Sequence, residues 1–303
     1  SSHALIISGV RRCGKSTLLH QWLMLKHSDA FYLNFEDPRL FELELNDFTR
    51  LDQIIRDKAC KTLFFDEIQV IDGWERYVRQ KLDEGLKVVV TGSSASLLSR
   101  ELGTKLTGRH ITKELFPFSY EEFCEFRSLE RSEQSLTTYL RIGGFPEYVK
   151  TENDDILHQL FEDILLRDIA VRYGVRDVKT LQRLALYLVS NIGNRVTGNK
   201  LKSLFGIGAT STVMDYFSHL EQTWLMHFIP KFSYSIRKQS INPRKVYAID
   251  TGLVNVNSKS FSDDVGRILE TLVFLHLRTS HKEICYFSEK GECDFVVLDK
   301  NQP

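Results

Sequence analysis

The sequence has no long hydrophobic run and no excess of charge of either sign. None of its apolar segments approaches the roughly 18 residues of a membrane-spanning helix, and no signal peptide precedes the first of them. Lys and Arg together number 40, and Asp and Glu together also number 40, so any basic surface has to be local. These absences exclude a membrane-spanning chain and a globally basic nucleic-acid-binding protein.

Cysteine is scarce, and no two cysteines have the spacing of a metal-binding or redox motif. The five positions contain no C-x-x-C motif: Cys13, Cys60, Cys124, Cys285 and Cys293. Neither a zinc site nor a disulfide framework is therefore indicated. Such cysteine usage fits a reducing compartment, and we expect a cytoplasmic protein.

What the sequence does contain fits a globular protein of about two domains, or three small ones. It has 303 residues, of which 42% are hydrophobic and 26% charged, a composition unlike that of disordered or fibrous chains. The chain opens directly into an apolar segment without an initiator Met and stops at Gln302-Pro303. We therefore expect it to be part of a longer protein.

One glycine-rich stretch lies between an apolar strand pattern and a helical pattern. The stretch is Gly9-Val10-Arg11-Arg12-Cys13-Gly14-Lys15-Ser16-Thr17. Its spacing, G-x-x-x-x-G-K-[ST], predicts a loop whose backbone N–H groups and helix N-terminus bind phosphate. Lys15 would reach the β- and γ-phosphates of a nucleotide, and the Ser16 hydroxyl would bind Mg²⁺. The alternative is a glycine turn before an ordinary helix. We assign nucleotide binding to Gly9, Arg12, Cys13, Gly14, Lys15, Ser16 and Thr17.

Further short apolar runs alternate with helical patterns up to about residue 128. They lie at 31–35, 62–65, 87–90 and 110–112. Strands that alternate with helices predict an α/β fold with a doubly wound, mostly parallel sheet. In such a sheet the ligand lies at the carboxyl ends of the strands. We expect residues 1–128 to form this first domain.

The run 62–65 closes on two adjacent acids, Asp66 and Glu67. This is the pattern of a Walker B element, in which Asp66 would hold the Mg²⁺ shell and Glu67 would orient or deprotonate the attacking water. The alternative is that acids end a strand because loops are solvated. The position downstream of the glycine loop favours the functional interpretation.

Small polar residues follow the next strand pattern, in Thr91-Gly92-Ser93-Ser94. Thr91 and Ser93 are candidates to bond the γ-phosphate or the water and so sense hydrolysis. Ser94 fits a helix N-cap, which is the alternative interpretation of this segment. Both interpretations can hold together.

Three arginines and one thiol are further candidates. Arg109 follows Leu-Thr-Gly and is a candidate arginine finger at the nucleotide edge; its alternative is a loop arginine paired with a carboxylate. Arg11 and Arg12 are candidates for the same role, with the alternative that they point outward. Cys13 lies beside Lys15 and a helix N-terminus, an environment that lowers a thiol pKa.

These motifs together resemble a known family. They are Gly-Val-Arg-Arg-Cys-Gly-Lys-Ser-Thr (9–17), Phe-Phe-Asp-Glu-Ile-Gln (64–69), Thr-Gly-Ser-Ser (91–94), Leu-Thr-Gly-Arg (106–109), Glu-Leu-Phe-Pro-Phe-Ser-Tyr-Glu-Glu-Phe (114–123) and Gly-Gly-Phe-Pro-Glu (143–147). The chain resembles the archaeal-type, AAA-related prokaryotic P-loop ATPases with a C-terminal domain of unknown function, from residue 5 to residue 298. The resemblance implies an additional-strand ATPase core with the P-loop strand central.

The segment 129–255 changes to helical spacing. Amphipathic helical patterns lead to a short helix at 198–205, a glycine turn, a longer helix from about residue 211 and an apolar strand at 224–229. This order predicts a helical domain that ends in a winged helix-turn-helix.

Charge makes duplex DNA a candidate partner of the wing at 231–245. This stretch contains no acid and five basic residues: Lys231, Arg237, Lys238, Arg244 and Lys245. The longer helix carries Asp215 and Glu221 but no Lys or Arg, which is poor for reading bases. A lid or an oligomer surface is the alternative.

Residues 256–303 read as a helix followed by a hairpin. By resemblance to the family, this region is similar to part of a restriction-endonuclease-like domain, with Glu270 and Asp294 as carboxylates of a Mg²⁺ site that clamps a phosphodiester. The chain stops before the strand that would bring the remaining carboxylate and lysine. An active nuclease and a catalytically empty fold both stay open.

Together these features predict a Mg²⁺-dependent ATPase that couples its nucleotide state to the winged-helix and nuclease-like regions. The chemistry is assigned to Lys15, Ser16, Thr17, Asp66 and Glu67, with Thr91 and Arg109 as further catalytic candidates. The alternatives are a slow nucleotide switch that binds DNA or a protein partner, an ATP-gated nuclease and a small-molecule kinase. Related ATPases complete their sites between subunits, so a homo-oligomer is also expected.

Overall fold

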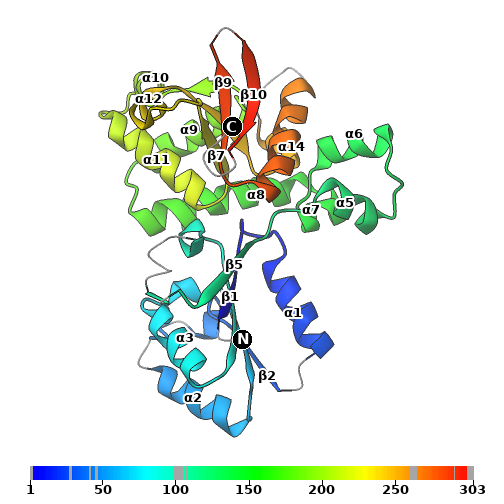
Figure 1. Cartoon of the computed structure of the whole chain (residues 1–303), viewed down its shortest axis with the longest axis vertical. Coiled ribbons are helices and arrows are strands. Elements are labelled where there is room, and N and C mark those ends of the chain that lie inside the picture. The colour runs from blue at the N-terminus through cyan, green and yellow to red at the C-terminus, as the bar shows by residue number, and fades with distance from the viewer. Residues whose placement is uncertain are drawn as a thin grey trace. The chain divides into compact units, whose positions relative to one another are not determined.

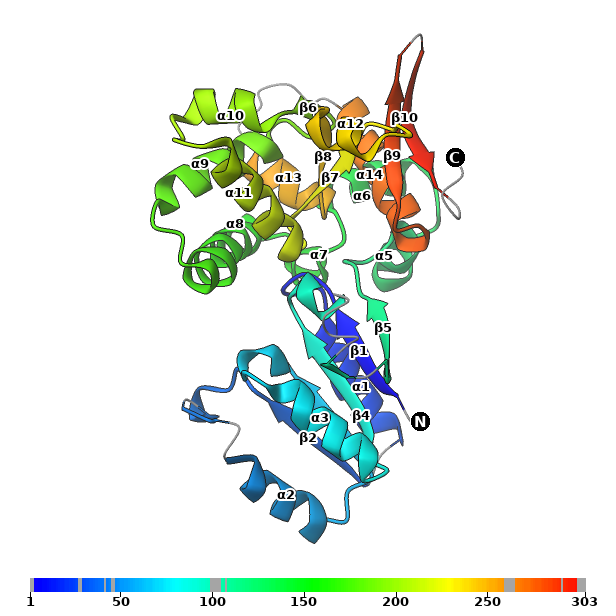
Figure 2. The same cartoon turned by 60° about the vertical axis from the view of Figure 1, so that its left-hand side comes forward.

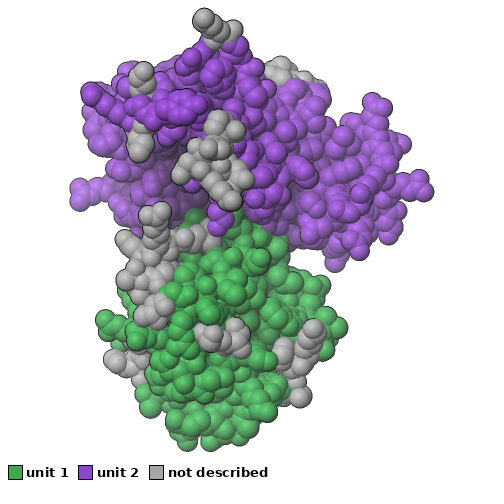
Figure 3. All heavy atoms as spheres, in the orientation of Figure 1, with its two compact units in different colours: residues 1–115 green, residues 116–303 purple. Residues whose placement is uncertain are grey.

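The computed structural model describes residues 3–26, 29–40, 42–44, 47–98, 105–106, 108–258, 265–289 and 291–298. The chain divides into two compact units, residues 1–115 and 116–303, drawn in green and purple in Figure 3. The three-part division expected at residues 128 and 255 stays a prediction.

Unit 1 is built on a five-stranded parallel sheet. Its strand order is β2-β3-β4-β1-β5, and every neighbouring pair runs parallel. The strands are β1 (Ala4–Ser8), β2 (Ala30–Asn34), β3 (Thr62–Asp66), β4 (Lys87–Gly92) and β5 (His110–Glu114). The predicted α/β parallel sheet is confirmed, and β4 lies between the loop strand β1 and the acidic strand β3.

Helices cover both faces of this sheet (Figures 1 and 2). They are α1 (Lys15–Lys26) on one face and α2 (Phe48–Asp57) and α3 (Trp74–Asp83) on the other, with short 3₁₀ turns η1 (Pro38–Leu40), η3 (Ile68–Val70) and η4 (Ala95–Leu98). Successive side chains of β3 point to opposite faces, so Leu63 and Phe65 pack with α2 and α3, whereas Phe64 packs with Leu19 of α1. Strand β3 is buried along its whole length, as a strand covered on both faces requires.

Unit 2 opens with a series of helices. They are α5 (Tyr120–Arg127), α6 (Glu133–Ile142), α7 (Pro146–Thr151), α8 (Asp154–Asp163), the π-helical η5 (Ile164–Val171) that continues α8, and α9 (Val178–Val189). Within the described residues, no helix combines the length and apolar character needed to cross a bilayer.

The second half of unit 2 surrounds a three-stranded antiparallel sheet of order β6-β8-β7. Its elements are β6 (Arg195–Val196), α10 (Gly198–Phe205), α11 (Thr210–Gln222), β7 (Met226–Pro230), α12 (Ile236–Ile241), β8 (Arg244–Ala248), α13 (Thr251–Asn257), α14 (Val265–Ser280), β9 (Ile284–Ser288) and β10 (Glu292–Val297). The β9–β10 hairpin shares one hydrophobic cluster with β7, β8 and α14, which includes Ile229, Tyr247, Phe274 and Tyr286. The hairpin therefore packs on the same core as the three-stranded sheet.

A buried carboxyl group, Asp250, joins the start of α13 to the glycine turn after α6. It accepts hydrogen bonds from the backbone N–H groups of Gly144 at 2.6 Å and of Leu253 at 2.8 Å. A Cβ on Gly144 would collide with the Phe118 carbonyl group, so the turn needs glycine there. This connection ties segments more than a hundred residues apart in the sequence.

The buried Asp250 carboxyl group should make the free energy of unfolding depend on pH. Burial raises the pKa of Asp250 from 3.8 to about 6, although the backbone donors of Gly144, Leu253 and Gly252 oppose this shift. Because the folded pKa lies above the unfolded one, the group stabilises the fold fully below pH 3.8, and that contribution is lost as the pH rises through about 6. The whole difference is about 3 kcal/mol.

The measurement is urea unfolding of the wild type and of Asp250→Asn at about pH 4 and about pH 7. Since the amide stays neutral, the wild type minus variant difference in unfolding free energy should fall by as much as about 3 kcal/mol between the two pH values. Asp155→Asn, at an exposed position in α8, controls for the loss of a carboxylate. A difference that does not change with pH would contradict the prediction.

Candidate functional site

The glycine loop connects β1 to α1 at the carboxyl edge of the sheet. Arg12 and Gly14 have positive φ angles of 61° and 105°, so the loop turns sharply before the helix begins at Lys15. A Cβ on Gly9 would collide with the Leu115 carbonyl group, which explains why glycine is needed at the close approach to the end of β5. The first N–H groups of α1 face the loop end without helical partners, as an anion site requires.

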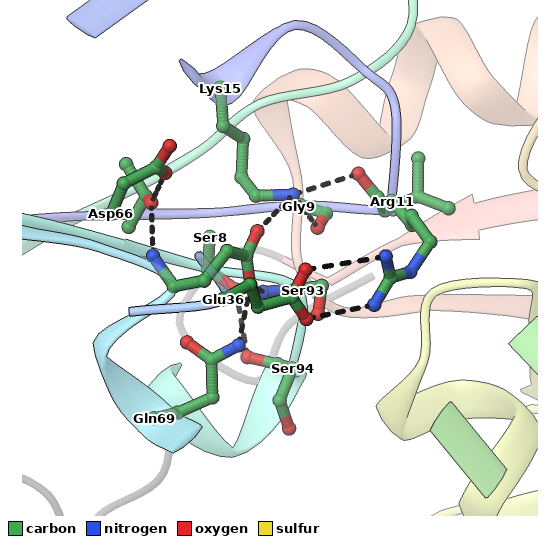
Figure 4. A network of polar contacts seen from close by, with 12 residues as sticks. Ser8, Gly9, Arg11, Lys15, Glu36, Asp66, Gln69, Ser93 and Ser94 are labelled. Atoms are coloured by element: carbon green, nitrogen blue, oxygen red, sulfur yellow. Dashed lines mark hydrogen bonds and ion pairs between the residues drawn. The ribbon is translucent and has the colours of Figure 1, made fainter. Parts of the chain in front are cut away.

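Lys15 is buried inside this loop, with 4% of its surface exposed. Its Nζ donates to the carbonyl oxygens of Gly9 at 3.1 Å and Val10 at 3.0 Å and lies 3.4 Å from a carboxylate oxygen of Glu67 (Figure 4). The loop lysine and the acid after β3 are 52 positions apart in sequence and meet at one edge of the sheet. The ammonium group thus lies where the phosphate site is predicted.

Asp66 ends β3 and is fully buried. It accepts a hydrogen bond from the Tyr32 hydroxyl of β2 at 2.9 Å and another from the Thr91 hydroxyl of β4. The Thr91 oxygen also accepts from the backbone N–H of Glu67 at 3.1 Å. Thr91 therefore links the two adjacent acids, and strands on both sides of β3 fix the orientation of the Asp66 carboxylate.

Glu67 follows with a left-handed backbone, φ 52°. Besides Lys15, its carboxylate accepts from the Gln69 amide at 2.5 Å and from the Ser93 backbone N–H at 3.1 Å. Burial alone would raise the pKa of Glu67, but the charge of Lys15 and the Gln69 hydrogen bond outweigh burial and hold the pKa below its usual value. The carboxylate is ionised and fully engaged in this arrangement.

Gln69 depends on a glycine in the neighbouring strand. A Cβ on Gly92 would collide with the Gln69 side chain, so the Gly in Thr-Gly-Ser-Ser makes room for the residue that holds Glu67. The Gln69 Oε1 atom is buried and has no hydrogen-bond partner within the described residues. It is a free acceptor directly beside the candidate base.

Three residues of this network were not assigned a role from the sequence: Tyr32, Glu36 and Gln69. Tyr32 lies in the middle of β2 and Glu36 follows that strand, where it forms an ion pair with Arg11 of the loop (Figure 4). The rule that carboxyl ends of parallel strands meet at one edge could have brought β2 into the search. It does not tell which side chains at that edge turn inward.

Cys13 is buried, and burial raises the pKa of its thiol although the nearby Lys15 charge and backbone hydrogen bonds oppose the shift. The expectation of a lowered thiol pKa is therefore wrong, because desolvation exceeds the effect of the cation. Ser16 and Thr17 occupy the first turn of α1, where Ser16 is half-buried and Thr17 exposed. Their roles toward Mg²⁺ and nucleotide stay predictions.

Arg109 lies at the amino ends of the sheet strands, whereas the glycine loop lies at their carboxyl ends. It directly precedes β5, whose first residue pairs with Ala4 at the start of β1, and its carbonyl accepts from the Ala4 N–H at 3.0 Å. Its guanidinium forms an ion pair with Asp83 at the end of α3. The expectation that Arg109 reaches the nucleotide edge of its own chain is wrong, because that edge is at the other end of the parallel strands. The preceding Thr107 lies outside the described residues.

The donor set at the carboxyl edge suits Mg²⁺ brought in with a nucleotide. Mg²⁺ is usually held by one or two protein oxygens together with phosphates and waters, and Ser16 and Asp66 offer one hydroxyl and one carboxylate. Among the described side chains, no group of three or more His, Cys, Asp or Glu residues could hold a metal ion. A metal that shares its ligands with a phosphate needs no such group.

The C-terminal carboxylates predicted for a nuclease-like site do come together, but around a lysine. Lys245 of β8 is 4% exposed, and its Nζ lies 3.0 Å from Glu270 and 2.6 Å from Asp294. The Tyr247 hydroxyl donates to Glu270 at 2.6 Å. Lys245 is therefore an internal cation and is not part of a basic surface.

Comparisons with known proteins agree with the α/β fold of unit 1. Residues 1–124 match the family model of an AAA domain, and residues 133–264 match a domain of unknown function, DUF8612. A solved structure of C. elegans PCH-2 aligns with 61% of this chain and with 54% of its own length. The sequence identity is 17% and the TM-score is 0.30.

Two relatives align with almost the whole chain. The chain is 34% identical over 324 residues to the uncharacterized protein MJ1544 of Methanocaldococcus jannaschii, covering 98% of this chain and 72% of that protein. It is 29% identical over 317 residues to an uncharacterized protein of Haemophilus influenzae, covering 96% and 78%. With this degree of similarity and the AAA match, the chain belongs to the same AAA-related ATPase family as the Methanocaldococcus protein.

Proposed function

We propose that this chain is a Mg²⁺-dependent ATPase whose reaction takes place at the carboxyl edge of the unit 1 sheet. The observation that supports this most strongly is the meeting of Lys15 with Glu67 at 3.4 Å, inside a glycine loop that opens a helix. A buried cation, free helix N–H groups and two adjacent acids are the groups that phosphoryl transfer to water requires.

The loop and the acids have different proposed roles, in phosphate binding and in Mg²⁺ binding and water activation. Lys15 and the N–H groups of the loop would bind the β- and γ-phosphates, and Ser16 and Asp66 would hold Mg²⁺, which would neutralise charge that develops on the phosphate oxygens. Thr91 keeps Asp66 in place through its hydroxyl. Thr91 of β4 and Ser93 just after it contact the acids, and they are the proposed reporters of the γ-phosphate.

Glu67 acts on the water, and its pKa couples that role to binding. Without nucleotide, the charge of Lys15 holds the pKa of Glu67 down, which makes the carboxylate a weak base. A triphosphate attracts the ammonium group toward its own oxygens, so the Lys15 contact weakens and the pKa of Glu67 rises. Nucleotide binding would thus make Glu67 a stronger base.

Two substitutions test this assignment. Glu67→Gln should bind ATP with near wild-type affinity and hydrolyse it at least about a hundredfold more slowly, because the amide cannot accept a proton. Lys15→Ala should already fail to bind. The measurements are ATP affinity by equilibrium binding and phosphate release with Mg²⁺.

Exposed unit 1 variants serve as controls, namely Glu44→Gln and Lys87→Ala, the latter at the amino end of β4. Both should keep wild-type rates. Hydrolysis by Glu67→Gln at the wild-type rate would overturn the base assignment. Absence of Mg²⁺-dependent hydrolysis by the wild type would overturn the ATPase itself and favour a nucleotide switch.

For unit 2 we propose a winged-helix module. Two helices, α10 and α11, precede strands β7 and β8, and β8 pairs with β6 on its other side, an arrangement that supports the predicted order. The proposed wing has fewer free charges than its sequence suggests, because Lys245 is buried between two carboxylates. Of the other four basic residues, Lys231, Arg237 and Arg244 have described side chains and Lys238 does not, and α11 carries the exposed Asp215. This charge pattern favours a protein partner over DNA.

The carboxylate pair Glu270 and Asp294 also favours regulation over DNA cleavage in this chain. Lys245 already neutralises both carboxylates, so a divalent ion would have to displace a buried ammonium group. An ATP-gated nuclease is therefore the weaker alternative. A homo-oligomer stays a prediction.

A binding measurement separates DNA from a protein partner. Because Lys245 is buried between two carboxylates and α11 carries an acid, we expect duplex DNA to bind weakly, to dissociate between about 50 and 200 mM salt and to leave the ATPase rate unchanged within about twofold. DNA binding that persists at the higher salt, together with a large change in turnover, would instead support a DNA-bound regulator.

A further inference from the structure

The loop contains a second cation with a carboxylate partner, Arg11. Its guanidinium makes a two-point contact with Glu36, at 3.0 Å from Nη2 and 3.5 Å from Nη1 (Figure 4). The Glu36 backbone N–H donates to the side chain of Asn34, the last residue of β2, at 2.9 Å. The ion pair therefore connects the phosphate loop to the segment that follows β2, the edge strand beside β3.

Arg11 lies in the same loop as Lys15, whose ammonium group contacts the candidate base Glu67. Lys15 and Arg11 each have a carboxylate in contact, Glu67 and Glu36, and both are turned toward the same edge of the sheet.

The position of this pair differs from that of an ordinary surface ion pair. The side chains of Arg11 and Glu36 are 16% and 27% exposed. One residue further along the chain, Asp37 pairs with Arg39, whose side chain is 88% exposed. The two acids are neighbours in sequence and each pairs with an arginine, but only the arginine that pairs with Glu36 belongs to the phosphate loop.

We propose that Arg11 contacts the terminal phosphate of ATP bound to its own chain, and that Glu36 positions Arg11 while no nucleotide is bound. This rests on the proposed ATPase function. A guanidinium matches the geometry of phosphate oxygens with two parallel hydrogen bonds, and a triphosphate carries more charge than the single carboxylate of Glu36. ATP therefore displaces Glu36, and the arginine that stabilises the transferring group comes from the loop and not from a second subunit.

The first test compares a non-hydrolysable ATP analogue with ADP, because only the analogue has a terminal phosphate. Arg11→Ala should weaken binding of the analogue by about tenfold or more and binding of ADP by about twofold or less. Its kcat for ATP should fall by about a thousandfold. Glu36→Gln should instead bind the analogue several-fold more tightly, about three- to tenfold, since Arg11 no longer has to leave a carboxylate.

The second test separates contact with phosphate from a structural ion pair. The double variant Arg11→Glu, Glu36→Arg restores a pair of opposite charges at the same place but puts an acid in the loop. It should stay folded by thermal unfolding and remain without activity. The matched exchange Asp37→Arg, Arg39→Asp should keep the wild-type kcat and affinities.

Three results would overturn the proposal while wild-type hydrolysis, and with it the ATPase function, stands. They are recovery of activity in the Arg11/Glu36 exchange, equal losses of ADP and analogue binding in Arg11→Ala, and an unchanged kcat in Arg11→Ala. If a second subunit supplied the catalytic arginine, Arg11→Ala would leave kcat unchanged. A wild-type chain without hydrolysis would instead refute the ATPase function, and analogue binding would still test the contact.

Discussion

A lysine buried in a loop of carbonyl groups is the constraint on which the candidate site depends. An ammonium group taken out of water needs hydrogen-bond acceptors and an opposite charge, and Lys15 finds two carbonyl oxygens of its own loop and one carboxylate, Glu67. That carboxylate can be there only because β3 and β1 run parallel with β4 between them. Gly92 then admits Gln69, and Gln69 holds Glu67. The sheet order, Gly92 and Glu67 thus all contribute to the surroundings of the buried Lys15 ammonium group.

Among the described residues two other lysines are buried, and their partners show why Lys15 is the one suited to a ligand. Lys81 lies 2.7 Å from both Asp52 and Glu84, and Lys245 lies within 3.0 Å of both Glu270 and Asp294. Each of these has two carboxylates in close contact, so an added anion would gain little. Lys15 has one, at a longer distance, and its other partners are neutral carbonyls. Its charge is the least neutralised of the three, and a phosphate can compete for it.

The parts of the site that are local in sequence were predictable, and the parts that depend on packing were not. The glycine spacing, Asp66-Glu67 and the alternation of strands and helices follow from short-range pattern. Arg109 was assigned to the wrong edge, although a residue before a parallel strand must lie at the amino end. Lys245 counted as surface charge because a sequence gives the sign of a charge and not its burial. Cys13 was assigned a low pKa because the nearby cation is visible in sequence and desolvation is not.

The pairing of loop cations with acids has a consequence for how such a site avoids unproductive states. An empty phosphate loop with two unpaired cations would attract any anion, and Glu67 left beside bulk water would be a free base with nothing to act on. Here Lys15 contacts Glu67 and Arg11 contacts Glu36, so the charges that we propose for catalysis also neutralise one another. Only a ligand with more negative charge than two separate carboxylates gains by breaking both pairs. Under the proposed function, these two ion pairs therefore contribute to selection for a triphosphate.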